Sequence, residues 1–378
     1  MKPKVLFEQY SIPHYRVPFF DALAKKVDLV VVASKNPRKG GGVQDTLLTP
    51  GFRSIRLDSD PASGLYHPGI IDVIQTEKPD VFISWNTSLR LLLHHDACLA
   101  LLKKKNTRVV WMGCDGYETQ NFMWGLLAEF LPWRLLRTLR DRRVLSRVDH
   151  FLAHSSHMRE YLKRVKRVPA EKITVAHNAI DTSGIVAAKA AHGEAQKNEY
   201  GIVFTGRLIS GKNIEMLLRA FATIVPLFPA ARLTIIGEGP AEEKLKALAR
   251  TLAIEEKTRF CGGIYDDARL TSELSKQSLF VLPGVGGLAL NTAMAAGLPI
   301  IHTFADGTEK DLVTEGVNGW FFDGSAGNLA KQIDRALSDP AALFAMGRES
   351  ERRITSVFTL EKMVDGYSLA IEKLTRTN

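Results

Sequence analysis

The sequence predicts an α/β protein built from two doubly wound domains. Short apolar runs of strand length alternate with helix-length segments along the 378-residue chain, as expected for repeated strand–helix units of a parallel sheet. The pattern stops once, over residues 183–199, and then restarts. Glycine-bearing turns follow several strands of the second half. Together these observations predict two Rossmann-like domains that face a central cleft, with ligands bound at the carboxyl ends of the strands.

The first domain is predicted to comprise residues 1–182. Its helix-length segments include Pro18–Lys26, Ile70–Glu77 and Met158–Val165. Its buried parallel strands are short apolar runs of three to five residues, namely Lys4–Phe7, Leu29–Ala33, Val81–Ser84, Val109–Met112, Phe151–Ala153 and Ile173–Ala176.

An Ala- and Lys-rich stretch of low apolar content, residues 183–199, is predicted to connect the domains, and residues 200–356 form the second. The helices Ile214–Ala222 and Ala289–Ala295 follow two of its strands. Its predicted strands are Ile202–Thr205, Arg232–Ile236, Thr258–Phe260, Leu279–Leu282, Ile300–Thr303 and Trp320–Phe322. A last helical segment within residues 357–378 carries its apolar residues on one face. It either completes the second domain or crosses back onto the first.

Composition narrows the class of protein. Hydrophobic residues make up 45% of the chain and no low-complexity tract occurs, which predicts a globular protein throughout. No apolar run reaches the roughly 18 residues that a membrane-spanning helix needs. The N-terminus turns polar at Glu8, too early for a signal peptide. Three widely spaced cysteines argue against a disulfide framework or a cysteine metal site. We therefore expect a cytoplasmic protein.

The net charge of +9 indicates an anionic partner. Nucleic acid is the weakest candidate, because no aromatic-plus-basic motif or zinc spacing accompanies the charge. Between Arg134 and Arg147 six arginines stand against one aspartate. The wider stretch Trp124–Arg147 repeats apolar residues at helical spacing opposite arginines. It predicts either peripheral contact with the acidic inner leaflet of a membrane or an ordinary domain helix with a solvated arginine face.

The most informative motif is the turn between the strand Ile202–Thr205 and the helix Ile214–Ala222. It reads GRLISGKN at 206–213 and places Arg207 and Lys212 five residues apart. Backbone N–H groups at a helix start attract anions. A planar guanidinium and a mobile ammonium can hold a diphosphate from two sides. A surface loop with incidental basic residues is the alternative.

Further turns are predicted at the same edge of the second sheet. Residues 237–240, GEGP, follow one strand and form either a ligand-facing turn or a plain tight turn. Residues 283–288, PGVGGL, place three glycines before a helix, an arrangement suited to oxyanions and sugar hydroxyls, although packing alone is an alternative explanation. Residues 306–311 and 315–319 add polar turns.

In order and spacing, these segments resemble the large retaining family 4 of the GT-B glycosyltransferases. The resemblance implies transfer of a sugar from a nucleoside-diphosphate sugar to a hydroxyl of a glycan or lipid-linked glycan, in cell-surface glycan synthesis. It is thinner in the first domain than in the second. The matching segments are GRLISGKNIEMLLRAF at 206–221, LTIIGEGP at 233–240, PGVGGLALNTAMAAGLPII at 283–301, DLVTEGVNGWFF at 311–322, FEQYSIPHYRVPFF at 7–20 and ITVAHNAID at 173–181.

The resemblance also implies roles for residues of the second domain. Arg207 and Lys212 match the pair that neutralises the diphosphate as its bond to the sugar breaks, so no divalent metal is required. No acidic metal spacing occurs in the sequence, and no cofactor besides the nucleotide-sugar co-substrate is expected. The positions implied to bind the donor are Gly206, Gly237, Glu238, Gly239, Gly284, Gly286, Gly287, Leu288, Asn291, Thr292 and Glu309.

One departure from the family concerns a pair of glutamates eight residues apart, which face the donor sugar and the ribose. Those places hold Gly284 and Thr292. Asn291 and Thr292 can hydrogen-bond a ribose hydroxyl without charge. Losing such a carboxylate costs roughly 1.5–3 kcal/mol unless another group replaces it, and Glu309 is the candidate replacement. The departure leaves the donor open and leaves room for an inactive relative.

The acceptor side is assigned to loops of the first domain. His14, Tyr15 and Arg16 lie between the first strand and a helix, where they either contact the acceptor or the phosphate or form a capping turn with a surface histidine. Many relatives carry a histidine near residues 112–116 that is aimed at the sugar, and Asp115 is the nearest polar candidate here. It is taken as a catalytic-site residue but not as a base, because the departing phosphate oxygen can itself accept the proton.

Two other functions stay open. The missing glutamate pair favours a non-catalytic partner subunit that binds a nucleotide sugar. A nucleotide-sugar epimerase is less favoured, because such enzymes need acid/base carboxylates around the sugar and the turns offer few.

Overall fold

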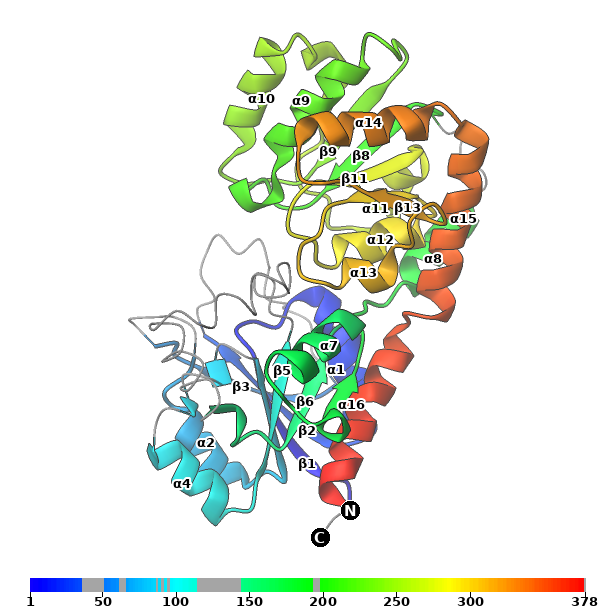
Figure 1. Cartoon of the computed structure of the whole chain (residues 1–378). Coiled ribbons are helices and arrows are strands. Elements are labelled where there is room, and N and C mark those ends of the chain that lie inside the picture. Colours follow the sequence, from blue (N-terminus) through cyan, green and yellow to red (C-terminus); the bar gives the residue numbers. More distant parts are fainter. Residues whose placement is uncertain are drawn as a thin grey trace. The chain divides into compact units, whose positions relative to one another are not determined.

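The computed structural model describes residues 1–35, 51–60, 66–85, 88–89, 92–93, 96–113, 144–192 and 198–376. It divides into two compact units, the first comprising Met1–Asn178 with Leu360–Asn378 and the second Ala179–Thr359. Each unit is a parallel sheet covered by helices (Figure 1). The predicted α/β class with two doubly wound units is confirmed.

The sheet of the first unit has the strand order β3-β2-β1-β4-β5-β6-β7 in the described residues. Its strands are β1 (Lys4–Glu8), β2 (Asp28–Ser34), β3 (Arg53–Leu57), β4 (Val81–Trp85), β5 (Arg108–Gly113), β6 (His150–Ala153) and β7 (Ile173–Val175). Strand β3 was not predicted. It lies at the edge of the sheet with exposed or half-buried side chains, so no buried apolar run marks it in the sequence.

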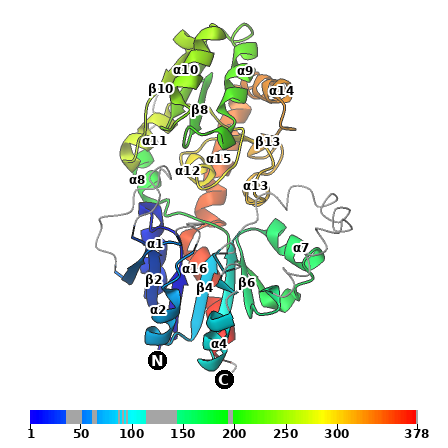
Figure 2. The same cartoon turned by 90° about the vertical axis from the view of Figure 1, so that its left-hand side faces the viewer.

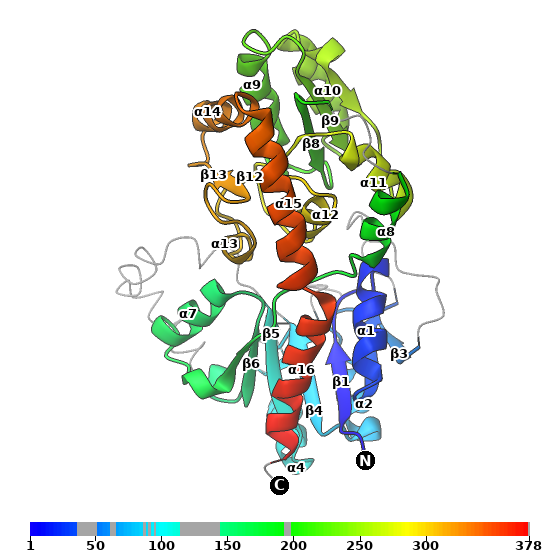
Figure 3. The same ribbon diagram turned by 90° about the vertical axis from the view of Figure 1, so that its right-hand side faces the viewer.

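Helices cover both faces of this sheet. On one face lie α1 (Val17–Ala24) and α16 (Leu360–Thr375), which pack against each other (Figure 3). On the other face lie α2 (Ile70–Glu77), α4 (Asp96–Lys104) and α7 (Ser156–Arg164), seen in Figure 2. Short 3-10 turns, η1 (His14–Arg16) and η2 (Ala170–Lys172), precede α1 and β7.

The C-terminal helix α16 contributes to the core of the first unit. The Tyr367 ring centroid lies 4.9 Å from that of Phe19 and 6.0 Å from that of Phe7. The Tyr367 hydroxyl lies 3.0 Å from Nε2 of the buried His154. Of the two courses left open for this segment, the structure shows the return to the first unit.

The sheet of the second unit has the order β10-β9-β8-β11-β12-β13. Its strands are β8 (Gly201–Thr205), β9 (Arg232–Ile236), β10 (Thr258–Phe260), β11 (Leu279–Leu282), β12 (Ile300–His302) and β13 (Gly319–Phe321). All six were predicted, although β10, with the sequence Thr-Arg-Phe, has only exposed or half-buried side chains. The order reverses between β8 and β11, and parallel sheets bind ligands beyond the carboxyl ends of the strands at such a point.

In Figure 1, α9 (Ile214–Ile224), α10 (Glu242–Thr251) and α14 (Ala326–Leu337) cover one face of this sheet. The other face carries α8 (Ser183–His192), α11 (Asp267–Ser275), α12 (Ala289–Ala295) and α15 (Pro340–Ser356). Helix α8 lies within the stretch assigned to a connection and packs against α11. The short elements η3 (Ser210–Lys212), η4 (Glu255–Lys257) and α13 (Glu309–Leu312) complete the unit.

Candidate functional site

Two turns meet at the strand reversal of the second unit. The basic turn, residues 206–213, follows β8, and the glycine-rich turn, residues 283–288, follows β11. Backbone N–H of Val285 donates to Gly211 O over 3.0 Å. The Lys212 ammonium donates to the carbonyl oxygens of Val285 and Gly286 over 2.6 and 2.7 Å. The two motifs that the sequence singled out are therefore bonded to each other.

The two predicted cations differ in their surroundings. Burial lowers the pKa of Lys212 to about 8, Asp306 opposes the shift and the charge of Arg207 adds to it. Arg207 is half-buried, and no described residue pairs its guanidinium with a carboxylate. Both side chains therefore bring positive charge to the carboxyl ends of β8 and β11. An anion placed there is attracted by both.

Close backbone packing accounts for several of the predicted glycines. A Cβ on Gly284 would lie 2.3 Å from Gly211 O, and one on Gly237 would lie 1.9 Å from Gly206 O. Neither place has room for a side chain, so the turns after β8, β9 and β11 stack as bare backbone. Gly239 is restricted in the same way by Leu208 O. The contact of these glycines with a donor stays a prediction, as does that of Gly206.

The end of the glycine-rich turn leads into α12. Gly287 has φ of +91°, and a Cβ added there would meet nothing within 4 Å. Leu288 O accepts from the Thr292 hydroxyl over 3.3 Å. Asn291 is 1% exposed, so it is buried in the unit and does not face solvent. The ribose contacts assigned to Asn291 and Thr292 remain predictions.

Glu309 is engaged by its own loop. It is 1% exposed, and its carboxylate oxygens accept from the backbone N–H groups of Ala305 and Gly307 over 3.0 and 2.9 Å. Burial raises the pKa of this carboxyl, whereas the backbone donors lower it. The carboxylate therefore shapes residues 305–309. That Glu309 replaces the missing carboxylate as a hydrogen-bond acceptor for the donor remains a prediction.

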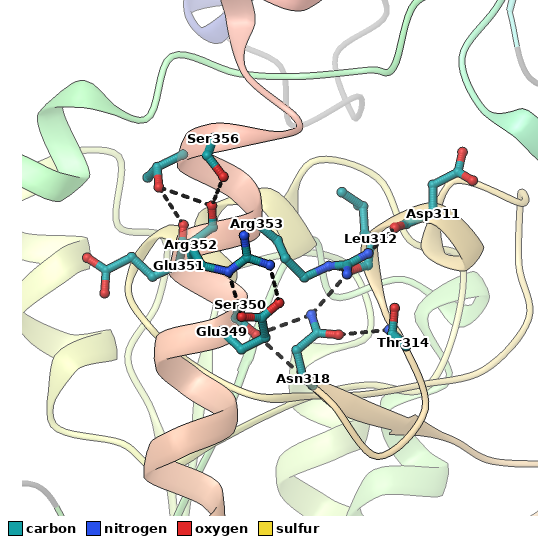
Figure 4. Close-up of polar contacts among 11 residues, drawn as sticks. Asp311, Leu312, Thr314, Asn318, Glu349, Ser350, Glu351, Arg352, Arg353 and Ser356 are labelled. Atoms are coloured by element: carbon teal, nitrogen blue, oxygen red, sulfur yellow. Dashed lines mark hydrogen bonds and ion pairs between the residues drawn. The ribbon is translucent and has the colours of Figure 1, made fainter.

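Helix α15 holds the loop that follows α13 (Figure 4). The Asn318 amide is fully buried, donates to Leu312 O over 3.1 Å and accepts from Thr314 N–H over 2.7 Å. The Arg353 guanidinium donates to Asp311 O over 2.9 Å and also reaches Leu312 O. These bonds fix the loop between α13 and β13. Its residues 315–319 run into the first residue of β13, which pairs with the first residue of β12. The turn 315–319 therefore lies at the amino ends of the strands, and its predicted place beside residues 306–311 at the carboxyl edge is wrong.

Sequence reasoning missed two side chains at this edge. Tyr265 follows β10, is 47% exposed and donates from its hydroxyl to Glu238 over 2.5 Å. That bond raises the pKa of Tyr265. His302, the last residue of β12, is fully buried beneath the glycine-rich turn. A polar residue that ends an apolar strand, or follows it in a glycine-bearing turn, is the signal that points to both.

The predicted acceptor residues lie at the carboxyl end of β1. His14 is exposed, Tyr15 is half-buried and Arg16 is 9% exposed. The Arg16 guanidinium lies 5.3 Å from the Phe19 ring centroid and points NH1 toward Met363 Sδ at 3.6 Å. His14 is thus the most accessible of the three, and an acceptor contact stays a prediction for all. Asp115 and the part of Trp124–Arg147 up to Arg143 lie outside the described residues.

Glu8, at the strand reversal between β1 and β4, is the centre of a polar cluster that the sequence did not predict. Its fully buried carboxylate accepts from the hydroxyls of Ser84 and Ser88 over 2.7 and 2.8 Å. Nδ1 of His67 lies 2.9 Å from its other oxygen. The cluster ties β1 to β4 and to the start of α2.

No group of three or more His, Cys, Asp or Glu side chains in the described part of the chain is arranged to hold a metal ion. None of its helices combines the length and apolar character needed to cross a membrane.

Comparison with known proteins gives matches in both units. The family model "Glycosyl transferases group 1" matches residues 187–353, and "Glycosyltransferase Family 4" matches residues 19–183. An uncharacterized glycosyltransferase of Methanocaldococcus jannaschii is 32% identical over 148 residues, 38% of this chain and 37% of the relative. The N-acetyl-alpha-D-glucosaminyl L-malate synthase of Bacillus anthracis is 28% identical over 232 residues, 59% of this chain and 58% of the relative. The chain thus spans about half the length, or less, of the curated relatives it matches.

Solved structures share the fold at low identity. Anabaena HepE, in complex with UDP and glucose, has a TM-score of 0.70 and 17% identity over 98% of this chain and 99% of that one. Sucrose-phosphate synthase from Thermosynechococcus elongatus has a TM-score of 0.73 and 18% identity over 99% of both chains. The two family models together leave only residues 184–186 unmatched between 19 and 353. The chain is therefore a glycosyltransferase of the family 4 type with the GT-B fold.

Proposed function

We propose that this enzyme transfers a sugar from a nucleoside-diphosphate donor to a hydroxyl acceptor, with retention at the anomeric carbon and without a metal. The observation that carries the proposal is the position of Arg207 and Lys212 at the strand reversal of the second unit, where Lys212 is bonded to the glycine-rich turn. A diphosphate bound at this edge meets the guanidinium of the basic turn and an ammonium that is bonded to the glycine-rich turn.

The chemistry follows from these charges. As the bond from the anomeric carbon to the phosphate oxygen breaks, negative charge develops on the departing diphosphate. Arg207 can bind two phosphate oxygens with its planar fork, and Lys212 supplies a point charge beside the glycine-rich turn. Fixed cations stabilise the developing charge more than they stabilise the bound donor. The acceptor hydroxyl forms the new bond at the anomeric carbon, and its proton passes to the departing phosphate oxygen.

The relatives suggest which substrates to test. The HepE structures hold UDP, UDP with glucose, or UDP-glucose, and another similar structure is a lipopolysaccharide outer core galactosyltransferase. We propose a hexose donor of this kind and a glycan or lipid-linked glycan acceptor, with acceptor contacts from His14, Tyr15 and Arg16. We also propose that the reaction takes place in the cytoplasm and that the stretch Trp124–Arg147 contacts an acidic inner leaflet, which the net charge of +9 favours.

One observation favours a second function, a nucleotide-sugar-binding partner without activity. Gly284 stands where the family has a glutamate that faces the donor sugar, and backbone atoms of Gly211 and Lys212 leave no room for a side chain there. A protein that binds the donor but lacks this carboxylate fits a regulatory subunit. The two functions agree on binding and differ only in turnover.

A two-stage experiment tests the proposal. First, UDP, GDP, UDP-glucose and GDP-mannose are compared for their effect on the melting temperature, since a ligand that binds only the folded state raises it. Second, the stabilising sugar nucleotide is incubated with polyprenyl-linked sugars, and the anomeric configuration of any product is read from its proton coupling constant. Stabilisation with product of retained configuration is the expected result. Stabilisation without product on any acceptor favours the partner subunit, and no stabilisation by any of the four contradicts both functions.

A further inference from the structure

The fully buried imidazole of His302 lies at the carboxyl end of β12, beside the end of β11. Leu282 and His302 are register partners in the two strands. The ring lies beneath the glycine-rich turn, because a Cβ placed on Gly286 would be 3.2 Å from Nε2. The charges of Asp306 and Lys212 both act on it. His302 is therefore part of the same edge as the basic turn.

Hydrogen bonding fixes the tautomer of this histidine. Nδ1 lies 2.5 Å from Leu282 O, and a carbonyl oxygen can only accept, so Nδ1 carries the proton. Burial lowers the pKa of His302 to about 4, which keeps the ring neutral near pH 7. Nε2 then presents a lone pair, and no described residue donates a hydrogen bond to it. A buried acceptor without a donor is unfavourable unless a ligand or water supplies the donor.

The turn above the ring offers little else to a ligand hydroxyl. Residues 284–287 are Gly, Val, Gly and Gly, so the turn contains no polar side chain. The carbonyl oxygens of Val285 and Gly286 already accept from Lys212. Gly286 and Gly287 have no side chains, so this part of the turn covers the ring with backbone alone, and contact between Nε2 and a ligand requires a displacement of the turn.

We propose that Nε2 of His302 accepts a hydrogen bond from a hydroxyl or an amide N–H of the donor sugar, which makes His302 a specificity-determining residue. The inference rests on the proposed function. The chemistry selects the sugar and not the phosphates, because a lone pair attracts O–H and N–H donors and repels phosphate oxygens. It also separates His302 from Arg207 and Lys212, which act on the diphosphate.

Titration calorimetry of the full chain with UDP and UDP-glucose, or GDP and GDP-mannose if the wild type prefers guanosine, separates these contributions. In His302→Phe, which keeps a ring but loses the acceptor, the Kd of the sugar nucleotide rises about tenfold, while that of the nucleoside diphosphate changes by less than about twofold. His302→Gln, which offers an amide oxygen, recovers part of the loss. With deoxy analogues of the sugar, the wild type discriminates against the one that lacks the bonded hydroxyl, and His302→Phe does not.

Other outcomes overturn the inference. Equal weakening of the diphosphate and the sugar nucleotide in His302→Phe means that the ring only supports the turn. Unchanged affinity for both, or a Gln variant no better than Phe, means that Nε2 does not contact the sugar. If the wild type binds no nucleoside diphosphate and no sugar nucleotide, the proposed function fails and the inference with it, a result distinguishable because it appears before any variant is made.

Discussion

The ammonium of Lys212 donates a hydrogen bond to Gly286 O over 2.7 Å, so a predicted phosphate ligand also joins two turns of the protein. A second bond, to Val285 O, strengthens this connection. Because one cation holds the glycine-rich turn and attracts the diphosphate, substitutions in this region change the position of the turn and the charge together.

The affinity for nucleoside diphosphates should fall as the pH rises through about 8, the lowered pKa of Lys212. The charged ammonium attracts phosphate, and the neutral amine does not. Calorimetry with UDP or GDP between pH 6.5 and 9.5 measures the trend. Lys212→Met should bind more weakly and show no such dependence. A wild-type profile as flat as that of the variant would contradict the assignment.

The stability contributed by Lys212 should change in the opposite direction. Its pKa is lowered from 10.5 to about 8 in the folded protein, so between these values the unfolded chain binds more protons. Binding of more protons by the unfolded state makes the free energy of unfolding rise with pH. Urea unfolding of the wild type, compared with Lys212→Met over this range, should therefore show a relative gain with rising pH. A relative loss would show that the ammonium is stabilised by its site.

Arg207→Ala should lower turnover by about 100-fold or more, because a fixed cation is removed from the developing phosphate charge. The melting temperature should change by less than about 2 °C, since the half-buried guanidinium pairs with no described carboxylate. Steady-state kinetics and thermal unfolding give both numbers. Arg207→Lys should recover only part of the activity, since a point charge lacks the planar fork.

Arg219→Ala is the matched control for this variant. Arg219 is exposed on α9 in the same unit, so its loss removes one positive charge from the surface without touching the basic turn. Its turnover should equal that of the wild type. Equal activity of Arg207→Ala and Arg219→Ala would remove the central argument for transfer.

Gly284→Ala should destabilise the second unit by about 1–3 kcal/mol and weaken diphosphate binding, as overpacking against backbone does. The added Cβ would lie 2.3 Å from Gly211 O and 2.6 Å from Lys212 Cα, so the two turns must separate. Gly284→Glu should restore no function for the same reason. Denaturant unfolding and calorimetry test both variants. Gly327→Ala, exposed in α14 with nothing within 4 Å of the new atom, should be neutral or stabilising.

The sequence predicted the second unit well because its signals are local. Five of its six strands are mostly buried apolar runs, and Gly237, Gly239 and Gly284 stand where the turns approach one another as backbone. The edge strand β3 lacks such a signal, because its residues are exposed or half-buried. Local pattern therefore indicates buried strands and tight turns more reliably than edges.

The polar clusters escaped prediction because their members are distant in the sequence. Glu8 is 59 residues from His67 and 80 from Ser88, and only the strand order brings them together. His302 faces Leu282 through the register of β11 and β12, which no property of either residue encodes. The place of α16 in the first unit likewise depends on contacts such as that of Tyr367 with Phe19.

Removal of divalent metals should leave turnover within about twofold of its starting value, because Arg207 and Lys212 supply the positive charge that a metal would otherwise bring. The protein is dialysed against EDTA, and the reaction is then measured with and without added Mg²⁺ or Mn²⁺. Activity lost on dialysis and regained with either ion would contradict the proposal. The released nucleoside diphosphate is measured directly, so that the detection step does not itself depend on a metal.

Glu8→Gln should destabilise the first unit by about 3 kcal/mol or more, because it leaves buried hydrogen-bond donors without their carboxylate. The wild-type carboxylate is fully buried and is contacted by two serine hydroxyls and by Nδ1 of His67. The new amide replaces one carboxylate oxygen, an acceptor, with an NH2 donor. That donor then faces either the two serine hydroxyls or Nδ1 of His67. Urea unfolding followed by circular dichroism measures the change.

Two further variants serve as comparisons for the stability of Glu8→Gln. Ser88→Ala removes one donor and leaves the carboxylate with its other partners, so it should cost only about 1 kcal/mol. Glu243→Ala, whose side chain is 84% exposed, should leave the free energy of unfolding unchanged within about 0.5 kcal/mol. If Glu8→Gln is as stable as Glu243→Ala, the cluster contributes nothing that its burial implies. If Glu8→Gln loses far more than Ser88→Ala, the buried carboxylate holds β1, β4 and the start of α2 together as one unit.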